Sequence, residues 1–160
     1  MRSRTPKRAK VELEARKLEA VFLEDMNHIC IICGAASAGV HHMIAGPNRG
    51  RALLVRASWL PLCWPCNSDK AEDKKTWPIH RQLALKFMCD PMFFDLYEIN
   101  KLLAPKECRS IPQAVDPEDV LPWIVSEARA VWMRDRGAAW IRDRGLDPEQ
   151  ELFPEMIYKG

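Results

Sequence analysis

The stretch from Cys30 to Lys70 contains two C-x-x-C pairs, Cys30-Ile-Ile-Cys33 and Cys63-Trp-Pro-Cys66, with His41-His42 between them and Asn67-Ser-Asp-Lys70 directly after them. The two cysteine pairs are separated by 29 residues. Two residues between cysteines allow a tight turn that aims both sulfurs at one ion, and two such turns complete a tetrahedral four-thiolate site. The spacing therefore predicts a structural zinc ion, rather than two unrelated pairs in a reduced core. Its predicted ligands are Cys30, Cys33, Cys63 and Cys66.

Side chains that can take part in catalysis lie within and beside the zinc clamp, the pair of cysteine turns at 30–33 and 63–66. His41 and His42 are adjacent in the segment between the cysteine pairs, and Asn67 follows the last cysteine. The clamp is therefore expected to bring these three side chains together. If residues 40–44 form a regular strand, the two imidazoles point to opposite faces unless the strand is distorted there.

Composition excludes several classes of protein. A chain of 160 residues with 48% apolar residues can build one domain with a real core. No apolar run approaches the ~20 residues that span a bilayer, so we expect no membrane partner. The first residues lack the apolar segment of a secretion signal. Cys89 and Cys108 lie outside the clamp, and free thiols beside a metal clamp favour a reducing, cytoplasmic location.

Charge is unevenly distributed along the chain. Residues 1–104 carry 16 Lys/Arg and 11 Asp/Glu, a net charge of +5, whereas residues 105–160 carry 8 and 11, a net charge of −3. Residues 26–68 contain no carboxylate, although Arg49, Arg51 and Arg56 lie among them. A carboxylate-free segment around a metal site favours a polyanionic partner. The alternative is a merely solvated basic loop.

Hydrophobic periodicity and turn residues predict a mainly helical chain around a short hairpin. We expect strands over 40–44 and 58–62, a turn at 46–50, and a position for Pro61 outside the centre of any sheet. A disordered basic arm over 1–8 is expected to precede the first helix. The predicted helices cover 9–26, the residues from about 67 onward, 78–89, 91 to about 103 and 117 to about 136.

The C-terminal tail contains a short internal sequence repeat, called the echo below. The segment Trp132-Met-Arg-Asp-Arg-Gly137 recurs eight residues later as Trp140-Ile-Arg-Asp-Arg-Gly145. Two copies are too few for a solenoid. The two tryptophans favour docking of the tail on the core, with nucleic-acid contact and self-association as alternatives. We expect any homodimer to form through these C-terminal helices.

The order of these motifs resembles the HNH, or His-Me finger, endonucleases. The matching pattern is C-x-x-C, then His41-His42 with an apolar pair, then Leu60-Pro-Leu-Cys-x-x-Cys-Asn67-x-x-Lys70. It is most similar to zinc-clamped members of the phage endonuclease VII type, and it covers residues 27–75. The resemblance implies an α+β chain with a zinc-clamped ββα-metal core. It divides the chain into 1–26 (basic arm and helix), 27–75 (nuclease core), 76–104 (helical pair) and 105–160 (C-terminal helical extension).

The resemblance also implies roles for individual residues. His42 takes the position of the general base, while His41 and Asn67 take the positions that hold a catalytic divalent cation. Lys70 matches a basic position close to substrate phosphate. Ser58 stands where the family has an asparagine that braces the loop presenting the general base, which is a departure from the pattern.

These residue types suit phosphodiester hydrolysis. A neutral imidazole can deprotonate water near pH 7, and Mg²⁺ or Mn²⁺ can offset charge on the phosphate. The sequence therefore predicts a metal-dependent DNA endonuclease that uses structural zinc and contacts DNA through Lys70, Arg49, Arg51 and Arg56. The resemblance suggests phage or mobile-element DNA processing or recombination, in a bacterial or phage-infected cell. The alternative is a zinc-stabilised, non-catalytic module that binds DNA or a protein.

Overall fold

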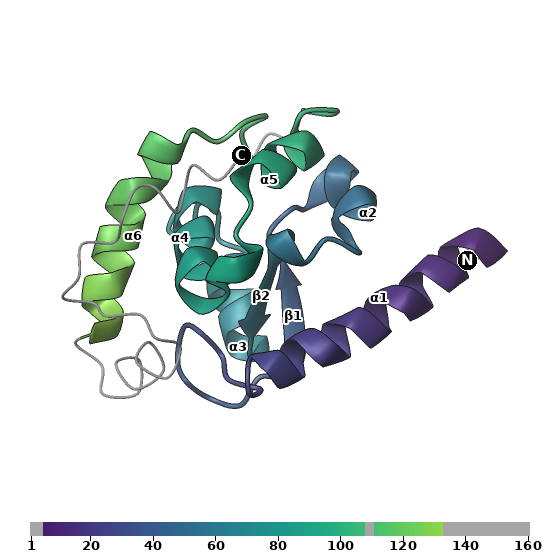
Figure 1. Cartoon of the computed structure of the whole chain (residues 1–160), viewed down its shortest axis with the longest axis horizontal. Helices are drawn as coiled ribbons and strands as arrows, with labels where there is room; N and C mark the ends of the chain where they lie inside the picture. The colour runs from purple at the N-terminus through teal and green to yellow at the C-terminus, as the bar shows by residue number, and fades with distance from the viewer. Residues whose placement is uncertain (1–4, 108–110, 133–160) are drawn as a thin grey trace.

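The described part of the chain, residues 5–107 and 111–132 of a computed structural model, combines helices with one two-stranded sheet (Figure 1). The long helices are α1 (Pro6–Asp25), α4 (Ile79–Cys89), α5 (Leu96–Leu103) and α6 (Pro117–Trp132). Two shorter helices are α2 (Arg49–Ala52) and α3 (Trp64–Cys66). Helix α3 continues as a π-helical turn over Asn67–Ala71. Three 3₁₀ turns cover Gly46–Asn48, Arg56–Ser58 and Pro91–Phe93. The predicted α+β class is confirmed. Within these residues no helix has the length and apolar character needed to cross a membrane.

The sheet is an antiparallel hairpin of β1 (Gly39–His42) and β2 (Trp59–Leu62). Its register is regular: Val40 faces Pro61, His41 faces Leu60 and His42 faces Trp59. Because side chains alternate along an undistorted strand, the two imidazoles point to opposite faces of β1. Pro61 lies in a sheet of only two strands, as expected, and its carbonyl accepts a 3.1 Å hydrogen bond from the Ile31 N–H. This bond attaches the first cysteine turn to β2.

Several element boundaries differ from the prediction. The expected turn at 46–50 is helical over 46–52, and the expected helix near Asn67 begins earlier, at Trp64. Helix α1 begins at Pro6, a favourable residue for a first helical position, so residues 6–8 belong to the helix and not to an arm. Helix α5 begins at Leu96 rather than at Pro91, because the Asp95 carboxylate accepts a hydrogen bond from the Glu98 N–H.

Only the C-terminal half of α1 contributes substantially to the core. Phe22 is fully buried and Leu23 nearly so, whereas Leu13, Leu18 and Val21 are exposed. The spacing of apolar residues in this helix predicts that Leu13, Leu18 and Val21 pack on the core together with Phe22, and that prediction is wrong for the first three. Figure 1 shows the reason, because the N-terminal half of α1 projects away from the body of the protein.

Helix α4 lies between the hairpin and α6 at the centre of the core. Nearly every residue of α4 is buried, including the polar Gln82 and Lys86. Val120 and Ile124 of α6 are also fully buried and belong to the same core cluster. The start of the predicted C-terminal extension thus packs with the preceding helices. The echo from Trp132 to Gly145 lies almost entirely outside the described residues, as does the proposed dimer surface beyond α6.

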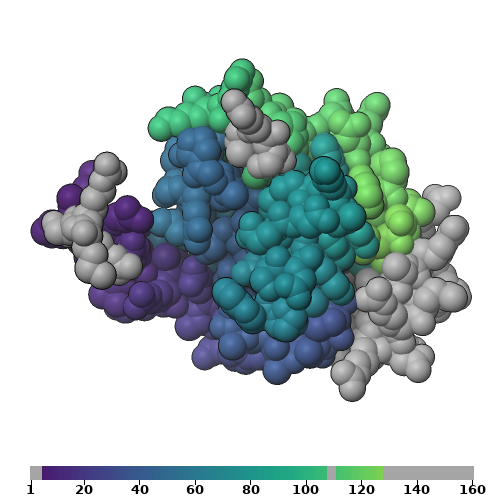
Figure 2. Space-filling view, turned by 180° about the vertical axis from the view of Figure 1, so that it is seen from behind, coloured from purple at the N-terminus to yellow at the C-terminus, as the bar shows by residue number. Residues whose placement is uncertain are grey.

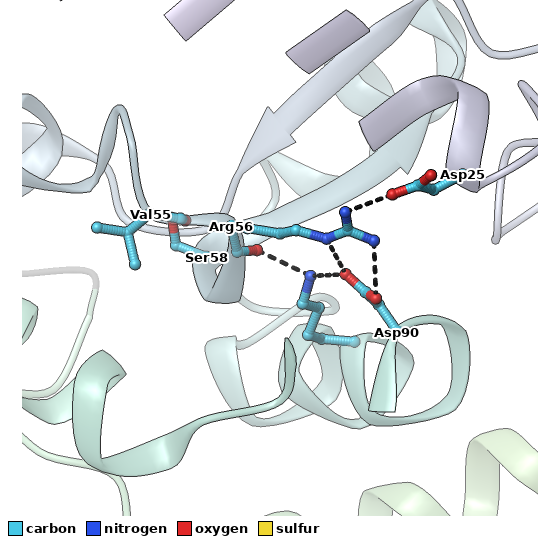
Figure 3. Close-up of polar contacts among 6 residues, drawn as sticks. Asp25, Val55, Arg56, Ser58 and Asp90 are labelled. Carbon is cyan, nitrogen blue, oxygen red and sulfur yellow. Dashed lines mark hydrogen bonds and ion pairs between the residues drawn. The ribbon is translucent and has the colours of Figure 1, made fainter. Parts of the chain in front are cut away.

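A buried charge cluster joins α1, the segment before β2 and α4 (Figure 3). The Arg56 guanidinium donates two hydrogen bonds to Asp90, of 2.9 and 3.1 Å, and a third of 2.5 Å to Asp25. The fully buried Lys86 ammonium donates to Asp90 at 2.6 Å and to the Arg56 carbonyl at 2.8 Å. The Asp90 carboxylate therefore neutralises two cations. Burial acts to raise the pKa of Asp90, but Arg56 and Lys86 outweigh it, so the net pKa is lowered. The cluster explains why Arg56 is only 19% exposed.

We expect Asp90→Asn to destabilise the fold by about 3–5 kcal/mol, because it leaves a buried lysine and a half-buried arginine without their shared carboxylate. Since the pKa of Asp90 is below its ordinary value of 3.8, the stabilisation is present above pH 3.8 and is lost as the pH falls through the lower folded-state value. Urea unfolding at neutral pH measures the effect. Asp25→Asn is the matched control, because Asp25 is 47% exposed, and its expected loss is about 1 kcal/mol or less. Equal losses for the two variants would contradict this account.

Candidate functional site

The four clamp cysteines converge at the end of the hairpin. All four sulfur atoms lie within 4.8 Å of one another, and those of Cys33 and Cys63 are 3.5 Å apart. Sulfurs around a tetrahedral zinc ion with bonds of ~2.3 Å are ~3.8 Å apart. The first turn is closed by N–H bonds of 2.8 Å from Cys30 to the Ala35 carbonyl and from Gly34 to the Cys30 carbonyl. Gly34 has a φ of 72°, which favours glycine. The cluster suggests a structural zinc site, as predicted.

Burial and neighbouring groups shift the pKa values of three thiols of the cluster. Burial raises the pKa of Cys30 and of Cys66. Burial also acts to raise the pKa of Cys33, but the Ala35 backbone N–H and the neighbouring thiols outweigh it and lower that pKa to about 7. Four thiolates at these distances repel each other, so full ionisation needs a bound cation. Zinc(II) fits this set of donors.

His41 and Asn67 lie together, as the sequence predicts. The His41 Nδ1 atom is 2.6 Å from the Asn67 Oδ1 atom, and its Nε2 atom is 2.9 Å from the Gln82 Oε1 atom. Asn67 reaches the strand because it begins the π-helical turn directly after Cys66. His41 is 3% exposed, so its ring is held on both sides within the protein.

Gln82 determines which nitrogen of His41 carries the proton. Its Nε2 atom donates to the carbonyls of Ala71 at 3.2 Å and Trp77 at 2.9 Å, which fixes its amide with the oxygen toward the imidazole. His41 Nε2–H must therefore donate to Gln82, and the Nδ1 lone pair faces Asn67. Two lone-pair atoms at 2.6 Å repel unless a cation lies against both of them or the Asn67 amide turns to donate.

A carboxylate lies near His41 on this face of β1. The Glu72 Oε1 atom lies 4.0 Å from His41 Nδ1, and the Glu72 side chain is 59% exposed. Burial lowers the pKa of His41 more than its bonds to Gln82 and Asn67 raise it, so the ring is neutral at pH 7. A neutral imidazole, an amide oxygen and a carboxylate fit a divalent cation such as Mg²⁺ or Mn²⁺.

The expectation that His42 meets His41 and Asn67 is wrong, because β1 is undistorted and His42 lies on its opposite face. Its Nε2 atom is 2.9 Å from the Glu19 Oε1 atom of α1, and its ring packs edge-on against Trp59. Its Nδ1 atom is buried and has no hydrogen-bond partner among the described residues. Burial lowers the pKa of His42, Glu19 raises it and Arg49 lowers it, with a net decrease. The ring is therefore neutral at pH 7 and can accept a proton.

A cleft of about 850 Å³ opens over His42, between the N-terminal half of α1 and the segment 46–53. Its basic lining residues are Lys7, Arg8, Arg16 and Arg49. Its acidic lining residues are Glu12, which pairs with Arg8 at 2.9 Å, and Glu19. Figure 2 shows the open space between α1, in purple, and the blue segment that includes α2. The cleft thus combines positive charge with an imidazole.

The remaining predicted site residues lie in different environments. Arg51 and Lys70 are exposed, and neither lines the cleft. Arg56 forms the internal ion pairs described above, which makes it a poor candidate for a phosphate contact. Ser58 is fully buried, and its hydroxyl donates to the Val55 carbonyl at 2.9 Å. Its own carbonyl accepts a 2.9 Å bond from Met43 N–H, next to His42.

Three residues of the candidate site escaped the sequence analysis, namely Gln82, Glu72 and Glu19. Gln82 had a weak signal, because a polar residue directly before Leu83 in a largely apolar helix is unusual. Glu19 and Glu72 had none, since their contacts depend on how α1 and the π-helical turn pack against β1. We compared the chain with family models, curated proteins and solved structures, and none of them matches it.

Proposed function

We propose that this protein is a metal-dependent endonuclease that hydrolyses phosphodiester bonds in DNA, with a zinc-clamped ββα-metal core of the HNH type over residues 27–75. The supporting arrangement is β1 followed by β2, α3 and the π-helical turn, with the cysteine cluster at the junction. The role is DNA processing, of the kind that phages and mobile elements need. Nicking of supercoiled plasmid in Mg²⁺ or Mn²⁺, with chelator as the negative control, tests the proposal.

The observation that carries this proposal is the pairing of His41 and Asn67. Gln82 turns the His41 lone pair toward the Asn67 oxygen, and residues that orient a ligand histidine in this way are typical of metal sites. His41 and Asn67 would hold a divalent cation here, and its positive charge would stabilise the scissile phosphate and the leaving 3′ oxygen.

His42 acts from the other face of the same strand. Hydrolysis with in-line geometry needs the attacking water and the leaving oxygen on opposite sides of phosphorus. We place the scissile phosphate across the edge of β1 that does not pair with β2, where both faces are within reach. His42 would then take a proton from the attacking water, while a cation held by His41 and Asn67 would offset the charge on the leaving oxygen.

Ser58 supports the position of His42 despite the departure from the family pattern. Its hydroxyl binds the loop carbonyl of Val55, and its backbone carbonyl binds the amide after His42. The segment before β2 is therefore held by hydrogen bonds of the short Ser58 side chain and backbone, in place of those that the longer asparagine side chain of the family would make. Because Ser58 is fully buried, a larger side chain would have to displace its neighbours.

The alternative function is a zinc-stabilised module that binds DNA or a protein without cleaving it. The observation in its favour is that Glu19 occupies one nitrogen of His42 while the other is buried. DNA binding without any metal-dependent nicking would support this alternative. Metal-dependent nicking by the wild-type protein, lost on substitution of His42, would exclude it.

DNA affinity is expected to fall steeply with salt, because Lys7, Arg16 and Arg49 of the cleft neutralise phosphates. The log–log slope changes by ~0.9 for each phosphate contact. Alanine at all three positions should therefore flatten the slope by roughly 2–3, as measured by fluorescence anisotropy with one duplex over a range of NaCl concentrations. Lys101→Ala is the control, since Lys101 lies on α5 and pairs with Glu98. A wild-type slope in the triple variant would show that DNA does not bind in this cleft.

A further inference from the structure

We propose that Glu19 of α1 is a positioning residue that fixes the proton of His42 on Nε2 and leaves its Nδ1 lone pair to accept a proton from water. The inference rests on the proposed nuclease function for its catalytic meaning. The Glu19–His42 contact itself can be tested without any activity. It assigns to α1, which lies outside the residues that resemble the HNH pattern, a direct part in the site.

The first argument is the bonding of the two ring nitrogens. The Glu19 carboxylate is an acceptor, so the 2.9 Å contact requires Nε2 of His42 to carry the proton. The opposite tautomer would place a lone pair against the carboxylate and bury an N–H at Nδ1 without an acceptor. Both changes are unfavourable, because an unsatisfied buried donor costs about 1–3 kcal/mol. The described geometry therefore selects one tautomer of the neutral ring.

The second argument is the environment of Nδ1. The His42 side chain is only 9% exposed, and Nδ1 is one of two buried side-chain polar atoms without a partner in the described residues. Such an atom in a native protein calls for a ligand or a functional reason. A water molecule is a suitable partner once DNA entering the cleft that His42 lines exposes this atom, because the water can donate to the lone pair and then lose its proton to it.

The third argument is the placement of the groups around the ring. Glu19 faces His42 from α1, Trp59 packs against it from β2, and Arg49 acts on it from α2. The ring is thus held in one orientation by a hydrogen bond and an aromatic edge. A carboxylate behind the imidazole also stabilises the positive charge that forms when the ring accepts the proton.

The test uses the full-length zinc-bound protein labelled with ¹⁵N in its histidines, at a pH above 7.5 and without added Mg²⁺. NMR of the wild type should show His42 protonated on Nε2, with a slowly exchanging proton. That proton should persist in Glu19→Gln, whose amide oxygen still accepts, and should be lost in Glu19→Ala. Protonation on Nδ1, or a proton unaffected in Glu19→Ala, would overturn the proposal.

Kinetics give the second readout. In single-turnover cleavage, Glu19→Ala should lower the rate by roughly 10–100-fold at saturating DNA, by analogy with the outer hydrogen-bond partners of metal-bound histidines, and Glu19→Gln should restore most of it. Glu14→Ala, an exposed position on the same helix outside the cleft, should cleave like the wild type. Zinc content and unfolding temperature identify misfolded variants. A wild type that does not cleave overturns the nuclease function alone, and Glu19→Ala with the wild-type rate overturns the positioning role.

Discussion

Cys63→Ser is expected to unfold the zinc-clamped core over residues 27–75, and removal of zinc by a strong chelator is expected to do the same. The free energy of metal binding in small zinc domains, about 10–16 kcal/mol, is also free energy of folding. Here the cluster joins the first cysteine turn to the end of β2, where backbone contacts such as the bond from Ile31 N–H to the Pro61 carbonyl are few. Without the ion, burial and mutual repulsion of the thiols oppose this arrangement.

Metal analysis and circular dichroism measure this effect. We expect about one tightly bound zinc per chain in the wild type and a large loss of stability in Cys63→Ser. Cys89→Ala is the matched control, because Cys89 is equally buried but lies on α4 outside the cluster. It should keep its zinc and lose only the few kcal/mol of a small core cavity. Complete folding in excess chelator would show that the four thiols do not depend on a metal.

The second large effect separates the two adjacent histidines. His42→Ala removes the proposed base, so turnover should fall by ~10²–10⁴-fold while DNA affinity changes little. Added metal should not restore the activity. His41→Ala and Asn67→Ala each remove a proposed metal ligand instead, and high Mn²⁺ should partly restore their cleavage, because Mn²⁺ binds imidazole and amide sites more tightly than Mg²⁺ does.

Single-turnover cleavage across a range of Mg²⁺ and Mn²⁺ concentrations distinguishes the two kinds of variant. Gln82→Ala should cause a smaller loss of the same kind as His41→Ala. It removes the acceptor that keeps the His41 proton on Nε2, and thereby keeps the Nδ1 lone pair toward Asn67. His80→Ala is the control, because that histidine lies near the start of α4 and near Asp119, away from the site. Full activity in His42→Ala would remove the proposed base and most of the case for an HNH mechanism.

The sequence predicts the parts of this site that depend on spacing along the chain. The paired C-x-x-C motifs predict that the four thiols meet. Because Asn67 directly follows Cys66, the same motifs predict that its amide lies near His41. Proline and acidic residues likewise predict the start of α6 at Pro117. The signal for α5 was also present, because Asp95 precedes Glu98 as a capping pattern does, although Pro91 suggested an earlier start.

The remaining contacts depend on packing between distant segments, which local patterns do not encode. Arg56 illustrates this point, because its place in a carboxylate-free stretch suggested DNA, yet Asp25 and Asp90 reach it from two other helices. Glu19 and Gln82 similarly approach the histidines from α1 and α4. Side chains that orient other side chains leave no trace in spacing, so a three-dimensional structure is needed to find them.

The length of β1 decides which imidazole faces which neighbour. Inserting or deleting one residue inside Gly39–His42 would exchange the faces of His41 and His42, so the imidazole that faces Asn67 would turn toward α1 instead. Bonds at both ends hold the present pairing, from Ser37 Oγ to the Gly39 carbonyl and from Met43 N–H to the Ser58 carbonyl. A one-residue change of length in this strand is therefore expected to break the contact of His41 with Asn67 and that of His42 with Glu19 together.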